Sequence, residues 1–169
     1  MNVKRKLRSR ITTDGLDRVP HRAFMRAMGI DDEAMAKPFV GVVTTAGEMT
    51  PCNMNLASQS LAAKRGILVG GGTPREFTTI TVSDGISMNH EGMKFSLISR
   101  ELIADSVELV VRGHAYDGII GIGGCDKNLP GLMMGMVRCN VPSVFRFGGS
   151  ALPGPWPGER QSVVSGTWG

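Results

Sequence analysis

The chain has 169 residues, a length that suits one globular domain with a hydrophobic core. Hydrophobic residues make up 41% and charged residues 20%, which is typical of a folded protein in water and excludes a largely disordered chain. No apolar stretch approaches the roughly 20 residues that a membrane-spanning helix needs, so we expect no membrane partner.

The formal net charge is +4, and much of it lies in the first ten residues, which contain Lys4, Arg5, Lys6, Arg8 and Arg10. We expect residues 1–15 to form a solvated basic tail. A nucleic-acid-binding arm is disfavoured because no aromatic residue lies between these charges to stack on bases. The run is not followed by an apolar stretch with a small-residue cleavage site, which excludes a secretory signal. We therefore expect a cytoplasmic protein, with a short organelle-targeting segment as the alternative.

Helical and extended patterns alternate through the first half of the chain. Pro20 is placed to open a short helix that ends at Gly29. Residues 39–45 are typical of a buried strand. Residues 55–69 fit a helix, which the three glycines at 70–72 end.

The alternation continues in the second half. Residues 77–83 are rich in Thr, Ile and Val, as a strand would be. Residues 99–112 have apolar side chains at helical spacing, and residues 117–122 form another short apolar run. A helix from about Pro130 and a strand over residues 143–147 complete the series.

This order predicts the α/β class, with a mostly parallel sheet flanked by helices. We expect the α/β domain to span residues 16–152. Residues 153–169 are rich in Pro, Gly and Ser and are expected to be irregular, at a point where a longer protein with a carboxyl-terminal domain is truncated.

Unusual polar residues follow three of the predicted strands, and ligands bind at the carboxyl ends of the strands in an open parallel sheet. Cys52 follows the first strand and Asp84 follows the second. Cys125, Asp126 and Lys127 follow the third. We therefore expect these side chains to meet at one edge of the sheet.

Each of these residues also has a structural interpretation. The three cysteines are too few and too scattered for a disulfide framework, and Cys139 is expected to be a buried core thiol. Cys125, among Gly, Asp and Lys, is either a ligand or a structural thiol. Asp84 could belong to a turn and Asp126 to a helix cap. The glycines before Cys125 lack the dinucleotide and P-loop spacings, which disfavours nucleotide binding.

Soft thiolates suit iron–sulfur clusters or zinc, whereas carboxylates suit magnesium or manganese. An edge that carries both kinds of ligand predicts two metal centres of different character. Lewis-acid chemistry on an oxygen-rich substrate would suit such a pair of centres. A structural zinc domain is disfavoured because the sequence has no Cys-x-x-Cys pair.

Several segments resemble dihydroxy-acid dehydratases in composition, order and spacing. The resemblance runs from about residue 7 to residue 150. Its motifs are Ser9-Arg10 with Thr13-Asp14-Gly15, Pro51-Cys52-Asn53, Val82-Ser83-Asp84-Gly85-Ile86, His90-Glu91-Gly92-Met93, the run from Ser99 to Glu108, and Gly123-Gly124-Cys125-Asp126-Lys127-Asn128.

The resemblance implies a role for each residue at the predicted edge. Cys52 and Cys125 are similar to two of the three ligands of a [2Fe-2S] cluster, and the presence of Cys52 favours the two-iron class. Asp84 and Asp126 are similar to Mg²⁺ ligands. Lys127 is similar to a lysine that is carbamylated in related enzymes, which requires its neutral amine.

The activity implied is that of a hydro-lyase of isoleucine and valine biosynthesis, which dehydrates 2,3-dihydroxyisovalerate and 2,3-dihydroxy-3-methylvalerate to 2-keto acids. The alternatives are a sugar-acid dehydratase of the same family and an inactive fragment. The resemblance also implies a homodimer, and it places the third cluster ligand and the catalytic base outside this chain, so we expect the 169 residues alone to be inactive.

Overall fold

The computed structural model describes residues 6–151, 154–156 and 159–160. It contains a four-stranded sheet in the order β2-β1-β3-β4, in which all strand pairs are parallel. The strands are β1 (Phe39–Thr44), β2 (Thr73–Thr78), β3 (Gly118–Gly123) and β4 (Ser143–Phe147). The predicted α/β class with a parallel sheet is therefore confirmed.

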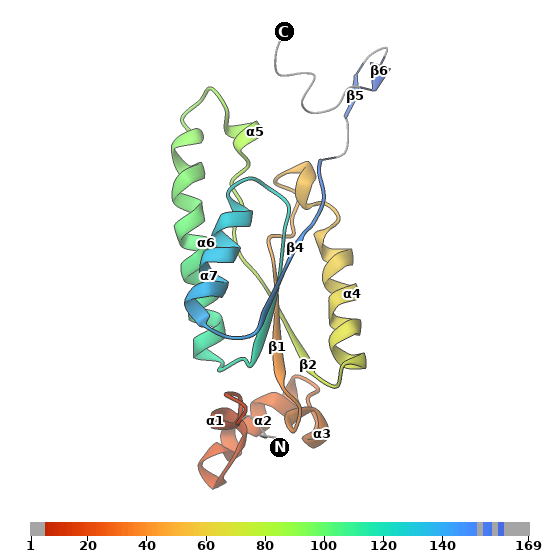
Figure 1. Ribbon diagram of the computed structural model, residues 1–169, viewed down its shortest axis with the longest axis vertical. Coiled ribbons are helices and arrows are strands. Elements are labelled where there is room, and N and C mark those ends of the chain that lie inside the picture. The colour runs from red at the N-terminus through yellow and green to blue at the C-terminus, as the bar shows by residue number, and fades with distance from the viewer. Residues whose placement is uncertain (1–5, 152–153, 157–158, 161–169) are drawn as a thin grey trace.

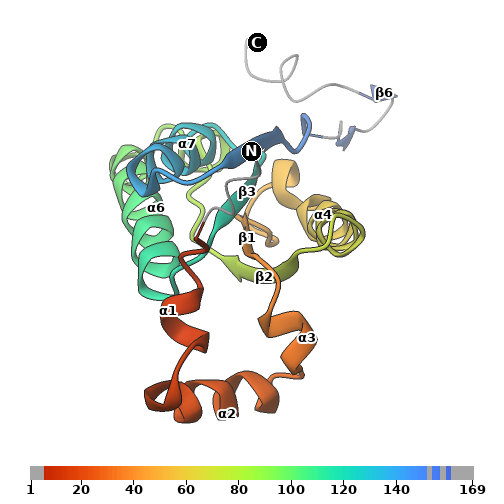
Figure 2. The same ribbon diagram turned by 60° about the horizontal axis from the view of Figure 1, so that its bottom comes forward.

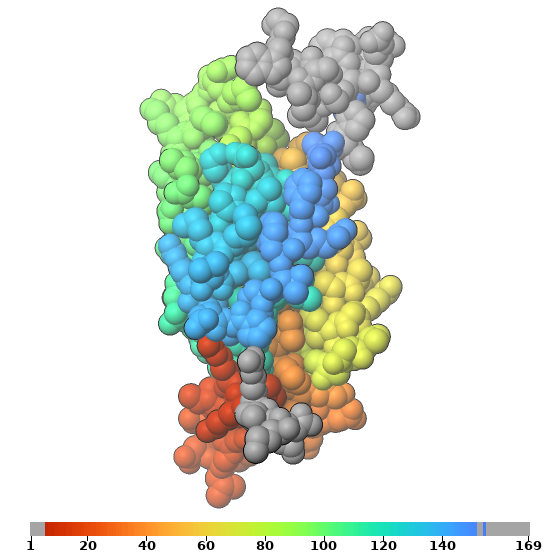
Figure 3. All heavy atoms as spheres, viewed as in Figure 1, coloured from red at the N-terminus to blue at the C-terminus, as the bar shows by residue number. Residues whose placement is uncertain are grey.

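Three long helices cover the two faces of this sheet. Helix α4 (Leu56–Val69) packs on one face, and α6 (Met93–Gly113) and α7 (Asn128–Cys139) pack on the other (Figure 1 and Figure 2). Figure 3 shows α7 beside β4 on the surface that faces the viewer. The layered arrangement follows from the alternation of strands and helices, because each crossover returns the chain to the same edge of the sheet.

The central strands supply both halves of the core. Val43 of β1 packs with Ile103 of α6 and Leu132 of α7, whereas the adjacent Val42 packs with Leu56 of α4. Successive side chains of a strand point to opposite faces, so strands between two helical layers must be apolar on both sides. Each such fully buried side chain contributes about 1.5–3 kcal/mol to folding.

Two predicted elements differ from the structure by more than two residues. The strand expected over residues 77–83 is β2 over Thr73–Thr78, and the helix expected over residues 99–112 begins earlier, at Met93. After Thr78 the chain leaves the ladder and runs along the sheet edge towards the site, so its β-branched residues form an extended loop. The first turns of α6 expose apolar side chains, which hides their helical period.

Four short helical segments lie at the amino edge of the sheet, opposite the carboxyl ends of the strands (Figure 1). They are α1 (Arg10–Thr13), the 3-10 helix η1 (Leu16–Arg18), α2 (Val19–Ala27) and α3 (Asp32–Met35). The expected helix opened by Pro20 corresponds to α2, which has a proline in its first turn.

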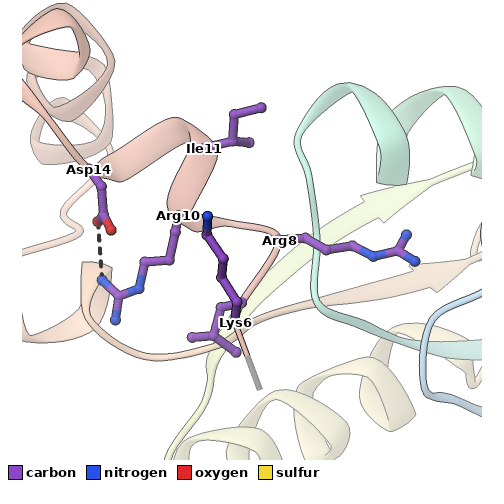
Figure 4. A pocket seen from close by; sticks show the side chains of 6 residues that line it. Lys6, Arg8, Arg10, Ile11 and Asp14 are labelled. Atoms are coloured by element: carbon purple, nitrogen blue, oxygen red, sulfur yellow. Dashed lines mark hydrogen bonds and ion pairs between the residues drawn. The ribbon is translucent and has the colours of Figure 1, made fainter. Parts of the chain in front are cut away.

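The basic segment is attached to this edge from Arg8 onward. The Arg8 guanidinium donates to the carbonyl oxygens of Cys139 at 3.1 Å and Asn140 at 2.8 Å. Ser9 is fully buried, and its backbone N–H donates to Asp117 Oδ1 at 3.1 Å. Figure 4 shows the hollow that this segment forms, with Arg10 turned towards Asp14. Arg8 and Ser9 thus differ from the solvated tail that the charges suggested.

The part of the chain after β4 is described only in pieces. A two-stranded antiparallel ladder joins β5 (Pro155–Trp156) and β6 (Glu159–Arg160). The rest of the expected irregular segment 153–169, apart from Gly154, lies outside the described residues. In the part of the chain that the structure describes, no helix combines the length and hydropathy needed to cross a bilayer.

Candidate functional site

The site lies at the carboxyl edge of the sheet, on the loops that follow β1, β2 and β3 (top of Figure 1). The chain passes from β1 to β2 on one side and then crosses back to β3 on the other side of β1. The direction of winding therefore reverses between β1 and β3, and such reversal points are where open α/β sheets bind ligands. Cys52 follows β1 and Cys125 follows β3, so both cysteines flank this point.

The two cysteines share one hydrogen-bonding partner, the hydroxyl of Thr50. This hydroxyl donates to Cys52 Sγ at 3.6 Å, and Cys125 Sγ donates to Thr50 Oγ1 at 3.8 Å. Cys125 is buried and Cys52 is half-buried. The fold thus brings together two thiols that are 73 positions apart in the sequence, and one of them remains accessible to a ligand.

A second group consists of Asp84, Asp126 and Lys127. The Lys127 ammonium donates to Asp84 Oδ2 at 2.8 Å and also to the Asp126 carboxylate. The hydroxyl of Ser96 donates to the other oxygen of Asp84. Asp84 is the first residue of the short helix α5 (Asp84–Ser87), and Lys127 precedes α7. Two carboxylates from separate loops therefore surround a single positive charge.

The electrostatics of this group favour its ionised forms. Hydrogen bonds to Asp126 and then to Asp84 raise the pKa of Lys127. Burial on its own would raise the pKa of Asp84, but hydrogen bonds from Lys127 and Ser96 outweigh burial and lower this pKa. At neutral pH the group therefore contains the Lys127 ammonium ion beside the Asp84 carboxylate.

One hydroxyl contact connects the sulfur group to the carboxylate group. Ser83 Oγ donates to Thr50 Oγ1 at 3.2 Å, and Ser83 immediately precedes Asp84. Cys125 in turn immediately precedes Asp126. The soft and the hard donors therefore lie in one site.

Two fully buried asparagines fix the loops beneath this site. Asn53 Nδ2 donates to the Thr45 carbonyl at 2.7 Å and to Thr81 Oγ1 at 2.8 Å. Asn128 Oδ1 accepts from Thr45 Oγ1 at 3.2 Å and from Thr81 Oγ1 at 3.4 Å. These residues belong to the loops after β1, β2 and β3, so the network holds all three loops in one arrangement.

The remaining candidates lie elsewhere or make local contacts. Cys139 is buried in α7, and burial raises the pKa of its thiol, as suits a core residue. His90 contacts the Ile86 carbonyl and accepts from the Gly92 N–H, and Glu91 pairs with Lys94, so both shape their own loop. Among the described residues, no group of three His, Cys, Asp or Glu side chains surrounds one metal position.

The sequence interpretation missed the hydroxyl residues of the site. Thr50, Ser83 and Ser96 are all buried, and each contacts a cysteine, another site hydroxyl or Asp84. Asn128 was named as the last residue of a motif, whereas its side chain is part of the buried network. A usable signal for Thr50 and Ser83 was that each lies within two residues of a Cys or Asp candidate, whereas Ser96 lies in α6 and had no such signal.

Comparison with known proteins identifies relatives of this chain. Residues 37–167 match the family model described as dihydroxy-acid/6-phosphogluconate dehydratase, N-terminal. The chain is 71% identical over 163 residues to dihydroxy-acid dehydratase 3 of Bradyrhizobium diazoefficiens. The aligned region covers 96% of this chain and 28% of that protein. The chain is 62% identical over 161 residues to dihydroxy-acid dehydratase of Pelagibacter ubique, covering 95% of this chain and 28% of that protein.

A more distant relative gives the same coverage. Dihydroxy-acid dehydratase of Thermosynechococcus vestitus is 52% identical over 158 residues, covering 94% of this chain and 28% of that protein. The chain thus spans little more than a quarter of the length of these relatives. The resemblance expected from the sequence motifs is confirmed.

Proposed function

The chain belongs to the dihydroxy-acid and 6-phosphogluconate dehydratase family, and we propose that it supplies part of the metal site of a hydro-lyase that dehydrates 2,3-dihydroxy carboxylic acids. The observation that supports this proposal is the Ser83–Thr50 contact, which links the two thiols to the carboxylate group at the winding reversal of the sheet.

Cys52 and Cys125 would hold a [2Fe-2S] cluster. The donor set fits because both sulfurs lie within reach of one hydroxyl, and thiolates are the usual ligands of such clusters. Thr50 would then donate its one hydrogen bond to Cys52 Sγ, which tunes the electron density of that ligand. When bound, the cluster supplies a Lewis acid for the leaving hydroxyl group.

Asp84 and Asp126 would hold Mg²⁺. The fit is visible in the Lys127 ammonium, a cation that both carboxylates already bind. Hard oxygen ligands suit Mg²⁺, which binds a few carboxylates together with substrate oxygens. Ser96 fixes one oxygen of Asp84, so the orientation of the carboxylate is set before any cation binds.

Lys127 is the proposed site of carbamylation. In the arrangement that the structure describes, its ammonium offsets part of the charge of the two carboxylates, and its pKa is raised by Asp126 and Asp84. A carbamate would replace this cation with an anionic oxygen donor. Carbamylation is therefore expected only when a divalent cation is bound, because this cation then supplies the positive charge that the Lys127 ammonium loses.

The proposed substrates are 2,3-dihydroxyisovalerate and 2,3-dihydroxy-3-methylvalerate, which would be converted to 2-keto acids in valine and isoleucine biosynthesis. The relatives reported above are named dihydroxy-acid dehydratases, which favours these substrates over sugar acids. A sugar-acid dehydratase is the second candidate because the family description includes 6-phosphogluconate dehydratase. A cytoplasmic homodimer is part of the same proposal.

The test is the iron and sulfide content of anaerobically purified protein, compared among three cysteine variants. Cys52→Ala and Cys125→Ala are expected to lose most of the bound iron and sulfide. Cys139→Ala is the matched control, because this thiol lies in the core and should leave iron binding unchanged. Zinc in place of iron, or equal iron loss in all three variants, would contradict the proposal.

A further inference from the structure

A separate cleft lies at the opposite edge of the sheet, between α2 and the amino ends of β1 and β2. Its volume is about 350 Å³. Phe24, Met25 and Met28 line it from α2 and the turn that follows, and Arg75 and Tyr116 line it from the side of the sheet. Cavities of about 300–1,000 Å³ are typical of small-molecule sites.

The apolar side of α2 is only partly covered by the rest of the described chain, because Met25 packs against the core whereas its neighbours do not. No residue of α2 is buried, and Phe24 and Met28 are 74% and 59% exposed. An amphipathic helix normally packs its apolar side against a core. Here Phe24 and Met28 form one wall of the cleft, which can therefore accept an apolar group of a ligand.

The cleft also contains a cation that no carboxylate neutralises. Within the described residues Arg75 makes no salt bridge, and its guanidinium contacts Met28 Sδ at 3.8 Å. None of the described residues that line the cleft is Asp or Glu, whereas His21 and His114 are both among them. Burial raises the pKa of Tyr116, so the phenol stays neutral and leaves the charge of Arg75 uncompensated.

We propose that this cleft binds a small carboxylic acid with an apolar body, which places its carboxylate on Arg75 and its hydrocarbon part against Phe24, Met25 and Met28. A guanidinium recognises a carboxylate through paired N–H donors. Among the described residues that line the cleft Arg75 has no lysine beside it, and one such arginine matches the single charge of a carboxylate better than the double charge of a phosphate. The proposal does not depend on the metal site, which lies at the other edge of the sheet.

The test is equilibrium dialysis of the purified protein with radiolabelled 4-methylpentanoate, a branched carboxylate. Saturable binding of about one molecule per chain is expected. Arg75→Met should weaken binding by about tenfold or more, because a hydrogen bond to a charged group is lost. Phe24→Gln should also weaken it. Arg65→Met is the matched control, since Arg65 is an exposed residue of α4 and should leave affinity unchanged.

Three outcomes would overturn the proposal. The first is the absence of saturable binding to protein whose circular dichroism melting curve shows that it is folded. The second is equal affinity for 4-methylpentanoate and the neutral 4-methylpentanamide, which would leave Arg75 without a role. The third is much tighter binding of a peptide that ends in leucine, which would identify the cleft as a docking site for a protein terminus.

Discussion

Gly124 lies against the backbone carbonyl of Cys52, so close that a Cβ atom at position 124 would overlap this oxygen. The contact joins the loop after β3 to the loop after β1. Both loops carry a cysteine of the candidate site. The spacing of the two thiols therefore depends on glycine at position 124, because only a residue without a Cβ atom allows the loops to lie this close.

Gly124→Ala is therefore expected to separate the loops and to lower both stability and iron binding. Overpacking of this kind costs about 1–3 kcal/mol. Urea denaturation would measure the free energy of unfolding, and the iron content would be measured on the same preparations. Gly66→Ala is the control, because Gly66 lies in α4 with open space at its Cβ position and should gain up to about 1 kcal/mol. A Gly124→Ala protein as stable as the parent would show that the loops can move apart freely.

The convergence of the thiols and carboxylates could be predicted from the sequence, but the network that holds them could not. Cys52, Asp84 and Cys125 each follow a strand of the sheet, and parallel strands end at the same edge of a sheet. The partners of Thr50 and Ser96 depend on loop conformations that have no periodic signal. The same limit applies to the basic segment, where Arg8 has partners 131 and 132 positions away.

Asn128→Ala is expected to destabilise the protein, because it removes an acceptor that the hydroxyls of Thr45 and Thr81 share and the donor to the Ile80 carbonyl. Each such hydrogen bond contributes about 0.5–1.5 kcal/mol. The measurement is the free energy of unfolding in urea. Asn55→Ala is the matched control, because Asn55 precedes α4 without a side-chain capping bond and is exposed. A loss of similar size in both variants would argue against a special role for the buried amide.

The lowered pKa of Glu76 predicts that its contribution to the free energy of unfolding depends on pH. Hydrogen bonds from Lys64 and then from Ser60 lower its pKa, so the native state favours the carboxylate. Stability from this group is present above the ordinary glutamate pKa and is lost as the pH falls through the lowered value. Because Lys64 and Glu76 are each about a third exposed, the effect is screened and should stay within about 1 kcal/mol.

The measurement compares the parent protein with Glu76→Gln in urea denaturation at pH 7 and at about pH 3. The parent should be the more stable at pH 7, and the difference should shrink at the acidic pH and in high salt. Glu48→Gln is the control, since Glu48 is an exposed residue. A difference between the parent and Glu76→Gln that does not change with pH would refute the role of the ionised carboxylate.

Exposed apolar side chains on the outer side of α6 lead us to expect that the purified chain self-associates. Phe95, Ile98, Leu102 and Leu109 are 52–72% exposed, and their spacing places them on one side of the helix. An apolar stripe of this kind normally marks a surface that another molecule covers. Leu102→Lys should therefore shift the protein towards the monomer in size-exclusion chromatography with light scattering, with little change in unfolding free energy because the position is half exposed. Leu61→Lys is the matched control, at an exposed leucine of α4 on the other face of the sheet. A parent chain that is already a clean monomer would refute this prediction.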